Sequence, residues 1–222
     1  MVRSFLAAAF VLLAACASVP HSEQTVSPAV ELVALQAVDN LFPSQGMLVH
    51  KVRVDAGRRD LVLTGYLLLD RKKGFQAVAV DEFGGKIFEF GSCLGKSEIR
   101  HAPPGIDHDL LLRGPVQDLI LLYLEPEEPW VKRSIEGDIL VSWVDGDMTI
   151  LCRAGRDGRR IEDCEETRGR HRIRNIIFSY DDESPDGSLI PSMITIVNDK
   201  LHYTMNAELL KLDRGLKREV CP

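Results

Sequence analysis

Apolar and polar residues alternate over most of this chain, in short stretches that are separated by turn residues. Val52 and Val54, for example, stand between Lys51, Arg53 and Asp55. A period of two places successive side chains on opposite faces of a β-strand, and short turns join antiparallel neighbours. The pattern predicts about ten strands, at residues 47–55, 60–70, 74–82, 86–91, 137–144, 147–153, 159–164, 170–181, 190–198 and 200–206.

Two segments follow the period of a helix instead. Apolar residues recur at intervals of three and four from Ser27 onward, with Pro28 at the first helical position. A second helix is predicted to begin at Pro115 and to end before Pro126. Residues 92–114 are rich in Pro and Gly and are predicted to form a loop.

So many antiparallel strands do not stay flat, because a twisted sheet of this size curls or splits. We therefore predict a mainly β (α+β) fold, in which a curled antiparallel sheet forms an incomplete β-barrel with the two helices as lid or plug. The composition, 45% hydrophobic and 27% charged with a net charge of -6, argues against disorder and against a nucleic-acid partner. One domain over residues 27–222 and a monomeric state are expected.

The N-terminus has the features of a bacterial lipoprotein leader. Arg3 precedes an apolar run, which ends in Leu13, Ala14, Ala15 and Cys16. We expect residues 1–15 to be removed as a signal peptide, Cys16 to carry acyl chains such as palmitate, and residues 16–26 to form a tether. An Ala rather than an Asp after the cysteine, as in the outer-membrane lipoproteins that this leader resembles, implies the periplasmic face of the outer membrane. The alternative is an ordinary leader that is cut at another small residue.

Four further cysteines follow, in a compartment where disulfides persist. Cys152 and Cys164 are equidistant from Gly158, so a hairpin that turns there places their side chains opposite each other. Cys93 and Cys221 are then left to form a second disulfide or to remain free thiols. The spacing of the cysteines does not favour a zinc site.

Residues 91–95, Gly-Ser-Cys-Leu-Gly, have the spacing of a nucleophile elbow around Cys93. Such an elbow needs a helix directly after it and parallel strands around it, whereas the neighbouring strands are predicted to be joined by hairpins. We therefore predict no enzymatic activity, no cofactor and no metal site.

Three segments resemble a known family: residues 80–88 (VDEFGGKIF), 116–124 (VQDLILLYL) and 189–196 (LIPSMITI). Together with the order of the elements, they are similar to the LolA/LolB-like carriers of periplasmic lipoproteins, and most of all to LolB-like outer-membrane lipoproteins. The resemblance implies an incomplete barrel lidded by helices, whose apolar concave face holds acyl chains.

Strand alternation then indicates which side chains line such a cavity. The predicted lining residues are Val52, Val54, Leu61, Leu63, Phe88, Phe90, Ile194 and Ile196. Alternation is the same in a filled barrel, so the alternative is an ordinary closed core.

Two surface features are candidates for contact with membranes. Phe83 stands where the LolB-like turn carries an exposed leucine that meets the membrane, although packing at the barrel rim is the alternative. An arginine-rich segment between residues 153 and 174 suits phosphate-bearing head groups or a partner protein, with a solvated strand face as the alternative. The predicted patch consists of Arg156, Arg159, Arg160, Arg170, Arg172 and Arg174.

The sequence thus predicts an outer-membrane lipoprotein that binds or transfers a lipophilic ligand, which is an acyl chain, a lipid or a lipoprotein. A structural or assembly lipoprotein, with a filled core and exposed faces that dock partner proteins, is the alternative.

Overall fold

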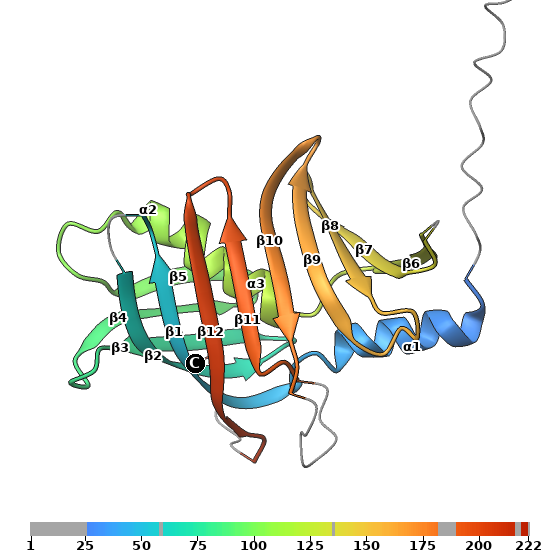
Figure 1. Ribbon diagram of the computed structural model, residues 1–222. Helices are drawn as coiled ribbons and strands as arrows, with labels where there is room; N and C mark the ends of the chain where they lie inside the picture. The colour runs from blue at the N-terminus through green and yellow to red at the C-terminus, as the bar shows by residue number, and fades with distance from the viewer. Residues whose placement is uncertain (1–25, 58–59, 135, 182–189, 216–218, 222) are drawn as a thin grey trace, which may run out of the picture.

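The computed structural model describes residues 26–57, 60–134, 136–181, 190–215 and 219–221. The expected leader, Cys16 and all but the last residue of the tether lie outside these residues. One antiparallel sheet dominates, and its twelve strands are ordered β5-β4-β3-β2-β1-β12-β11-β10-β9-β8-β7-β6 (Figure 1). The strands are β1 (Gln45–Asp55), β2 (Asp60–Asp70), β3 (Gly74–Val80), β4 (Lys86–Cys93), β5 (Lys96–His101), β6 (Trp130–Arg133), β7 (Ile139–Asp145), β8 (Met148–Ala154), β9 (Ile161–Arg168), β10 (His171–Ser179), β11 (Met193–Asn198) and β12 (Tyr203–Asp213).

The sheet is curled and open. Strands β5 and β6 are its two edges, and they do not pair with each other. In the middle, β1 pairs with β12 and thereby joins the meander β1–β5 to the strands β6–β12. The predicted mainly β, incomplete barrel is therefore confirmed.

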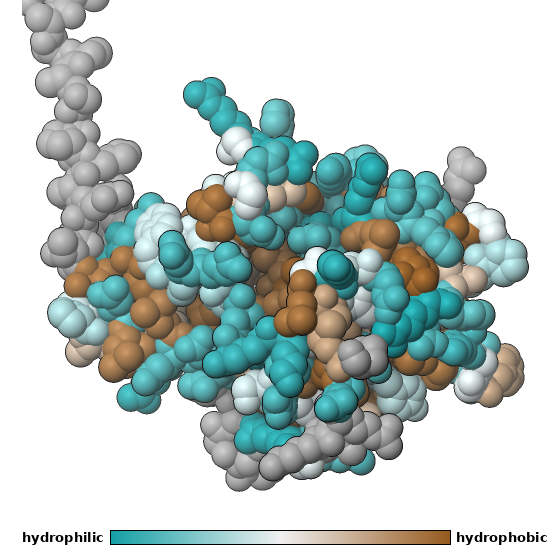
Figure 2. All heavy atoms as spheres, turned by 180° about the vertical axis from the view of Figure 1, so that it is seen from behind, coloured by the Kyte–Doolittle hydropathy of each residue, from teal (hydrophilic) through white to brown (hydrophobic). Residues whose placement is uncertain are grey.

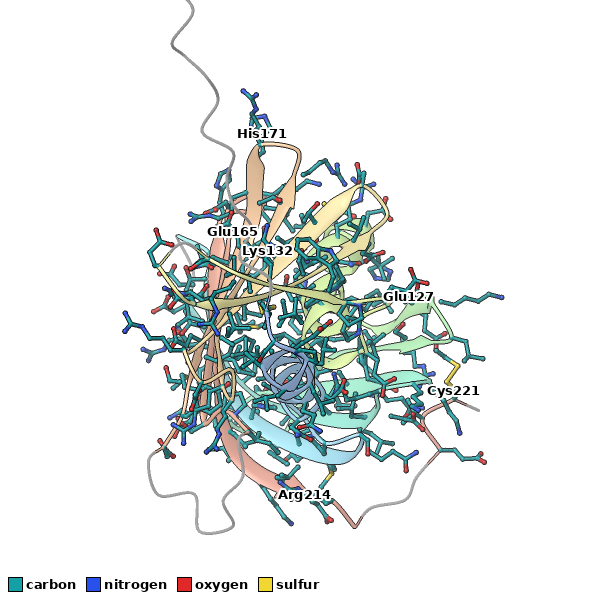
Figure 3. All side chains as sticks on the ribbon, turned by 90° about the vertical axis from the view of Figure 1, so that its right-hand side faces the viewer. Glu127, Lys132, Glu165, His171, Arg214 and Cys221 are labelled. Carbon is teal, nitrogen blue, oxygen red and sulfur yellow. A yellow bond between two sulfur atoms is a disulfide. The ribbon has the colours of Figure 1, made fainter. Side chains whose placement is uncertain are left out.

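Two helical segments cover the concave face. Helix α1 (Pro28–Asp39) packs against β6 and β7, and Figure 3 looks along its axis with the strands curved around it. The second segment consists of α2 (His108–Leu111), a π-helical stretch (Leu112–Val116) and α3 (Gln117–Tyr123). We call residues 108–123 the lid segment. The chain leaves edge strand β5, crosses the concave face as the lid segment and reaches the opposite edge at β6 (Figure 1).

The prediction of a loop over residues 92–114 was wrong. This stretch contains strand β5, and the helix begins at His108 rather than at Pro115. The Asp107 side chain caps the helix by accepting a hydrogen bond of 2.9 Å from the backbone N–H of Asp109. Pro115, which has no backbone N–H to donate, lies inside the π-helical stretch.

The ten predicted strands are present, with shifted ends. The largest shift is in β12, which reaches Asp213 instead of residue 206. The alternation also gave no sign of β6, because four residues are too few to show a period.

Two disulfides fix parts of the sheet. Cys152 of β8 is bonded to Cys164, which is its register partner on β9. Cys93 at the end of β4 is bonded to Cys221, and this bond ties the C-terminal segment to the sheet.

Candidate ligand-binding site: an apolar cavity under the lid segment

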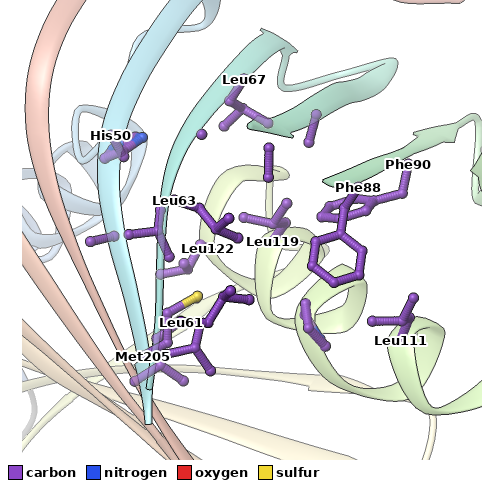
Figure 4. A pocket seen from close by; sticks show the side chains of 18 of the residues that line it. His50, Leu61, Leu63, Leu67, Phe88, Phe90, Leu111, Leu119, Leu122 and Met205 are labelled. Atoms are coloured by element: carbon purple, nitrogen blue, oxygen red, sulfur yellow. The ribbon is translucent and has the colours of Figure 1, made fainter. Parts of the chain in front are cut away.

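A cavity of about 330 Å³ lies between the lid segment and strands β1–β4, β11 and β12. Its volume falls at the lower end of the range of about 300–1,000 Å³ that is typical of small-molecule sites. Figure 4 shows leucines and phenylalanines from the strands and from the lid segment pointing into this space. Among the described residues, the lining contains no Lys, Arg, Asp or Glu. The site is therefore suited to an uncharged, apolar ligand.

All eight predicted lining residues lie around this cavity. The strand register explains why, since Val52 faces Leu63 and Val54 faces Leu61 across β1 and β2. Alternation from strand to strand therefore keeps one face apolar. The alternative of a filled core does not describe this half of the concave face.

The cavity exists because the sheet beneath it carries small residues. Gly65 faces His50 in the register, Ala77 faces Leu67, and Ala207 faces Val52. All three small residues line the cavity. Side chains of this size cannot reach the lid segment, so a space stays open that larger residues would fill.

The cavity reaches the surface near the β1–β2 turn. Its lining residues Leu61 and Leu110 are 38% and 51% exposed, whereas Ile194 and Ile196 at its inner wall are buried. Figure 2 shows hydrophobic side chains at the bottom of a recess near the middle of the face that it displays. The cavity thus has an apolar mouth through which a ligand can enter.

The other half of the concave face, under α1, is filled. Val38 and Leu41 meet Trp143, Ile150 and the Cys152–Cys164 disulfide around a void of about 20 Å³. A void of this size holds about one water molecule. Large side chains thus make this half an ordinary core.

Arg71 joins the ends of both helical segments at one end of the barrel. Its side chain is buried and donates hydrogen bonds to the carbonyl oxygens of Val38 and Asp39 at the end of α1, and to that of Tyr123 at the end of α3. The carbonyl groups of Asp39 and Tyr123 have no partner within their helices, so the guanidinium supplies one. The carbonyl of Val38 also accepts a hydrogen bond of 3.3 Å from the backbone N–H of Leu41. The rings of Phe42 and Tyr123 pack beside it, with their centroids 4.3 Å apart.

A buried ionic cluster holds the middle of the lid segment against the sheet. Arg174 of β10 is 2% exposed, and its Nε and Nη1 atoms lie 3.0 Å from Asp118 Oδ1 and 3.0 Å from Glu166 Oε2. The hydroxyl group of Tyr203 donates a hydrogen bond to the Asp118 carboxylate. Burial raises the pKa of Asp118 to about 6, although Arg174 opposes this shift, and burial also raises the pKa of Glu166. We call these four residues the ionic cluster.

The prediction that Arg174 belongs to a surface patch was therefore wrong. Arg174 stands two positions before Ile176 and shares its inward face, where two carboxylates pair with it. The alternation of β10 already placed Arg174 on the inward face. The prediction instead grouped it with the neighbouring arginines as one positively charged surface.

The other arginines of the predicted patch lie at opposite ends of β9. Arg156, Arg159 and Arg160 are in the β8–β9 turn, whereas Arg170 and Arg172 are at the β9–β10 turn, about 26 Å away along eight residues of strand. Arg172 pairs with Asp199 at 2.6 Å, and Arg160 lies over the ring of Tyr180. These residues do not form one continuous patch.

His50 is a polar residue of the cavity that the sequence analysis missed. It is 5% exposed, lines the cavity from β1, and its Nε2 atom lies 3.4 Å from the hydroxyl oxygen of Tyr123. Burial lowers the pKa of His50 to about 4, so the ring is neutral at neutral pH. Its position two residues before Val52 placed it on the predicted inner face.

Phe83 is 88% exposed at the tip of the β3–β4 turn and does not pack at the rim. The Asp81 carboxylate accepts hydrogen bonds from the backbone N–H groups of Phe83 and Gly85, at 3.0 and 2.7 Å. The turn therefore has its own hydrogen-bonded support for a projecting aromatic ring.

Other chemistry finds little support in the described part of the chain. Cys93 is disulfide-bonded and has no free thiol for the nucleophile elbow. Among the described residues, no three His, Cys, Asp or Glu side chains lie in an arrangement that could hold a metal ion. None of the described helices is long and apolar enough to cross a membrane.

The fold and the cavity define a class of protein, namely an open antiparallel barrel whose helices cover an apolar concave face. No protein-family model and no curated protein matches the sequence. Among solved structures, a LolA superfamily protein from Nitrosomonas europaea is similar, with a TM-score of 0.63 and 10% identity over 87% of this chain and 96% of that one. The chain thus has the fold of the LolA superfamily.

Two further solved structures share this fold. A domain described as an outer membrane lipoprotein-sorting protein from Vibrio parahaemolyticus has a TM-score of 0.54 and 8% identity, over 84% of this chain and 94% of that one. A DUF1329 family protein from Desulfovibrio piger has a TM-score of 0.51 and 10% identity, over 85% and 94%.

Proposed function

We propose that this protein is a lipid-anchored lipoprotein of the outer membrane that holds an acyl chain of a lipid or lipoprotein in the cavity under the lid segment. The observation that carries the proposal is the cavity, with its uncharged lining and its mouth at Leu61 and Leu110. Each buried methylene contributes about 0.8 kcal/mol, so about ten of them contribute about 8 kcal/mol before the entropy cost of binding. No charged contact is needed for such a ligand.

The membrane attachment in this proposal is the acylated Cys16, at the end of a tether of about ten residues. The exposed Phe83 is proposed as a second membrane contact, because its turn and the β1–β2 turn at the mouth lie at the same end of β2 and β3.

Acylation of Cys16 is tested by labelling cells with radioactive palmitate. We expect label in the wild-type protein and none in a Cys16→Ser variant. Equal labelling of both would refute acylation at Cys16.

Ligand binding is tested on the mature chain that carries Cys16→Ser behind an ordinary secretory leader, so that the protein is free of its own lipid. We expect native mass spectrometry of this protein from the periplasm to detect a bound amphiphile. A Leu119→Trp variant fills the cavity from the lid segment and should lose the ligand. The matched control is Leu210→Trp on the exposed face of β12, which should keep it. A wild-type protein that is consistently empty, and that takes up no added methyl laurate, would contradict the proposal.

A further inference from the structure

One side chain in the apolar cavity has an unused hydrogen-bonding group. His50 is buried and lines the cavity, and its register partner Gly65 has no side chain to cover it. Figure 4 places His50 on β1, next to the leucines that point into the cavity. A polar group in such surroundings is costly unless it has a partner.

Only one of the two ring nitrogens has such a partner among the described residues. The hydroxyl group of Tyr123 is buried, and its partner among the described residues is Nε2 of His50 at 3.4 Å. Because a buried O–H needs an acceptor and no other one lies beside it in the described part of the chain, we assign the hydroxyl as the donor. With Nε2 as the acceptor, the proton of the neutral ring is on Nδ1. The Nδ1 atom has no hydrogen-bond partner in the described part of the chain. Because His50 lines the cavity, this nitrogen is the group that a ligand can pair with.

The surroundings restrict what this donor can bind. The described lining residues include no cationic side chain, and His50 is neutral. A carboxylate or phosphate held among them would therefore lose its hydration without compensation. An uncharged carbonyl oxygen needs one donor and no counter-charge. Ester and amide carbonyl groups at the head of an acyl chain meet this requirement.

We propose that His50 is a specificity-determining residue, which donates its Nδ1–H to the ester or amide carbonyl oxygen of a bound acyl chain. Tyr123 positions it by holding Nε2. The inference rests on the proposed function and adds the class of ligand: acyl esters and amides are preferred over hydrocarbons of the same length.

The experiment uses the mature chain with Cys16→Ser and the uncharged fluorophore N-phenyl-1-naphthylamine as a cavity probe. Methyl laurate and tetradecane, which are matched in length, compete for the probe. We expect the wild-type protein to bind the ester about two- to tenfold more tightly than the hydrocarbon, as one net hydrogen bond predicts. A His50→Phe variant should bind both equally, with the affinity for tetradecane unchanged. The conservative His50→Gln variant should restore part of the preference.

The matched control is His171→Phe, which makes the same replacement at the exposed β9–β10 turn, outside the cavity, and should leave the preference intact. Equal binding of ester and hydrocarbon by the wild-type protein, or an equal loss of both in His50→Phe, would overturn the role of His50 while leaving the proposed function in place. If neither competitor nor the probe binds the wild-type protein, the cavity is not a ligand site and both proposals fail.

Discussion

Under α1 the inward positions of the sheet carry Trp143, Ile150 and Ile176, whereas under the lid segment they include Gly65 and Ala77. Both halves belong to one sheet with one alternation, and both are covered by a helical segment. The first half encloses a void of about 20 Å³ and the second a cavity of about 330 Å³. The volume of the inward side chains, rather than the fold, thus decides whether the concave face becomes a core or a binding site.

The two halves also differ in how their helices are held. Helix α1 packs along its length, through buried residues such as Ala34, Ala37 and Val38. The lid segment is fixed at its C-terminal end by Arg71 and in its middle by the ionic cluster. A helix that is fixed at such points can span an open space, because its attachment does not depend on filling that space.

The largest effect that we expect concerns the ionic cluster. Replacement of Arg174 by Met leaves Asp118 and Glu166 buried without their cation, which should lower the free energy of unfolding at pH 7 by about 3–5 kcal/mol. Urea unfolding measures this change. The matched control is Arg172→Met on the same strand, whose exposed ion pair should contribute less than about 1 kcal/mol. Equal effects of the two variants would show that the cluster does not hold the lid segment.

The next prediction compares truncation in the two halves. Ile150→Ala under α1 should cost about 3–4 kcal/mol, because it opens a cavity in a filled core. Leu63→Ala should cost about 2 kcal/mol less, since Leu63 already borders an open space. Chemical denaturation of both variants tests this. Equal costs would mean that the space beside Leu63 is filled in solution.

Acidification tests the burial of His50, the polar residue in the half of the concave face that lies under the lid segment. Burial lowers the pKa of His50 to about 4 in the folded protein, while an unfolded chain has a histidine pKa of about 6.5. The unfolded state therefore binds more protons between these values, and the free energy of unfolding falls as the pH drops. Between pH 7 and pH 4.5, His50→Phe should reduce this fall by about 2 kcal/mol.

Urea unfolding at the two pH values measures the difference, with His171→Phe at the β9–β10 turn as the control. Asp118 has the opposite sign, because its pKa is raised to about 6 and its contribution to stability grows as the pH falls. It is present in the wild-type protein and in both variants, so it cancels. An unchanged pH dependence in His50→Phe would contradict the burial of a neutral His50.

The smallest effect concerns added volume. Ala154→Val in the filled half has no room and should destabilise the protein by about 1–3 kcal/mol. Ala77→Val faces the cavity and should change the free energy of unfolding by less than about 1 kcal/mol. Thermal unfolding compares the two variants. A destabilisation by Ala77→Val as large as that by Ala154→Val would argue against free space at Ala77.

Local patterns in the sequence predicted what depends on neighbouring residues. The period of three and four at Ser27 gave α1, and the turn around Gly158 gave the pairing of Cys152 with Cys164. The local patterns failed for β5 and for the start of the lid segment. The prolines and glycines of residues 92–114 predicted a loop, although the segment contains a short edge strand and the start of a capped helix. The patterns also failed for Arg174: its register partner Glu166 lies on the neighbouring strand β9, but its second partner, Asp118, comes from the remote lid segment.

By itself, the sequence determined which side chains face inward, because a strand has a period of two whatever it packs against. All eight predicted lining residues follow from that period. Only the tertiary structure decided that the space between them stays open. This depends on Arg71 and the ionic cluster, which hold the lid segment over small residues of strands that are far apart in the chain. The distance between the lid segment and the sheet, which keeps this space open, results from contacts between remote segments. No local pattern of residues encodes it.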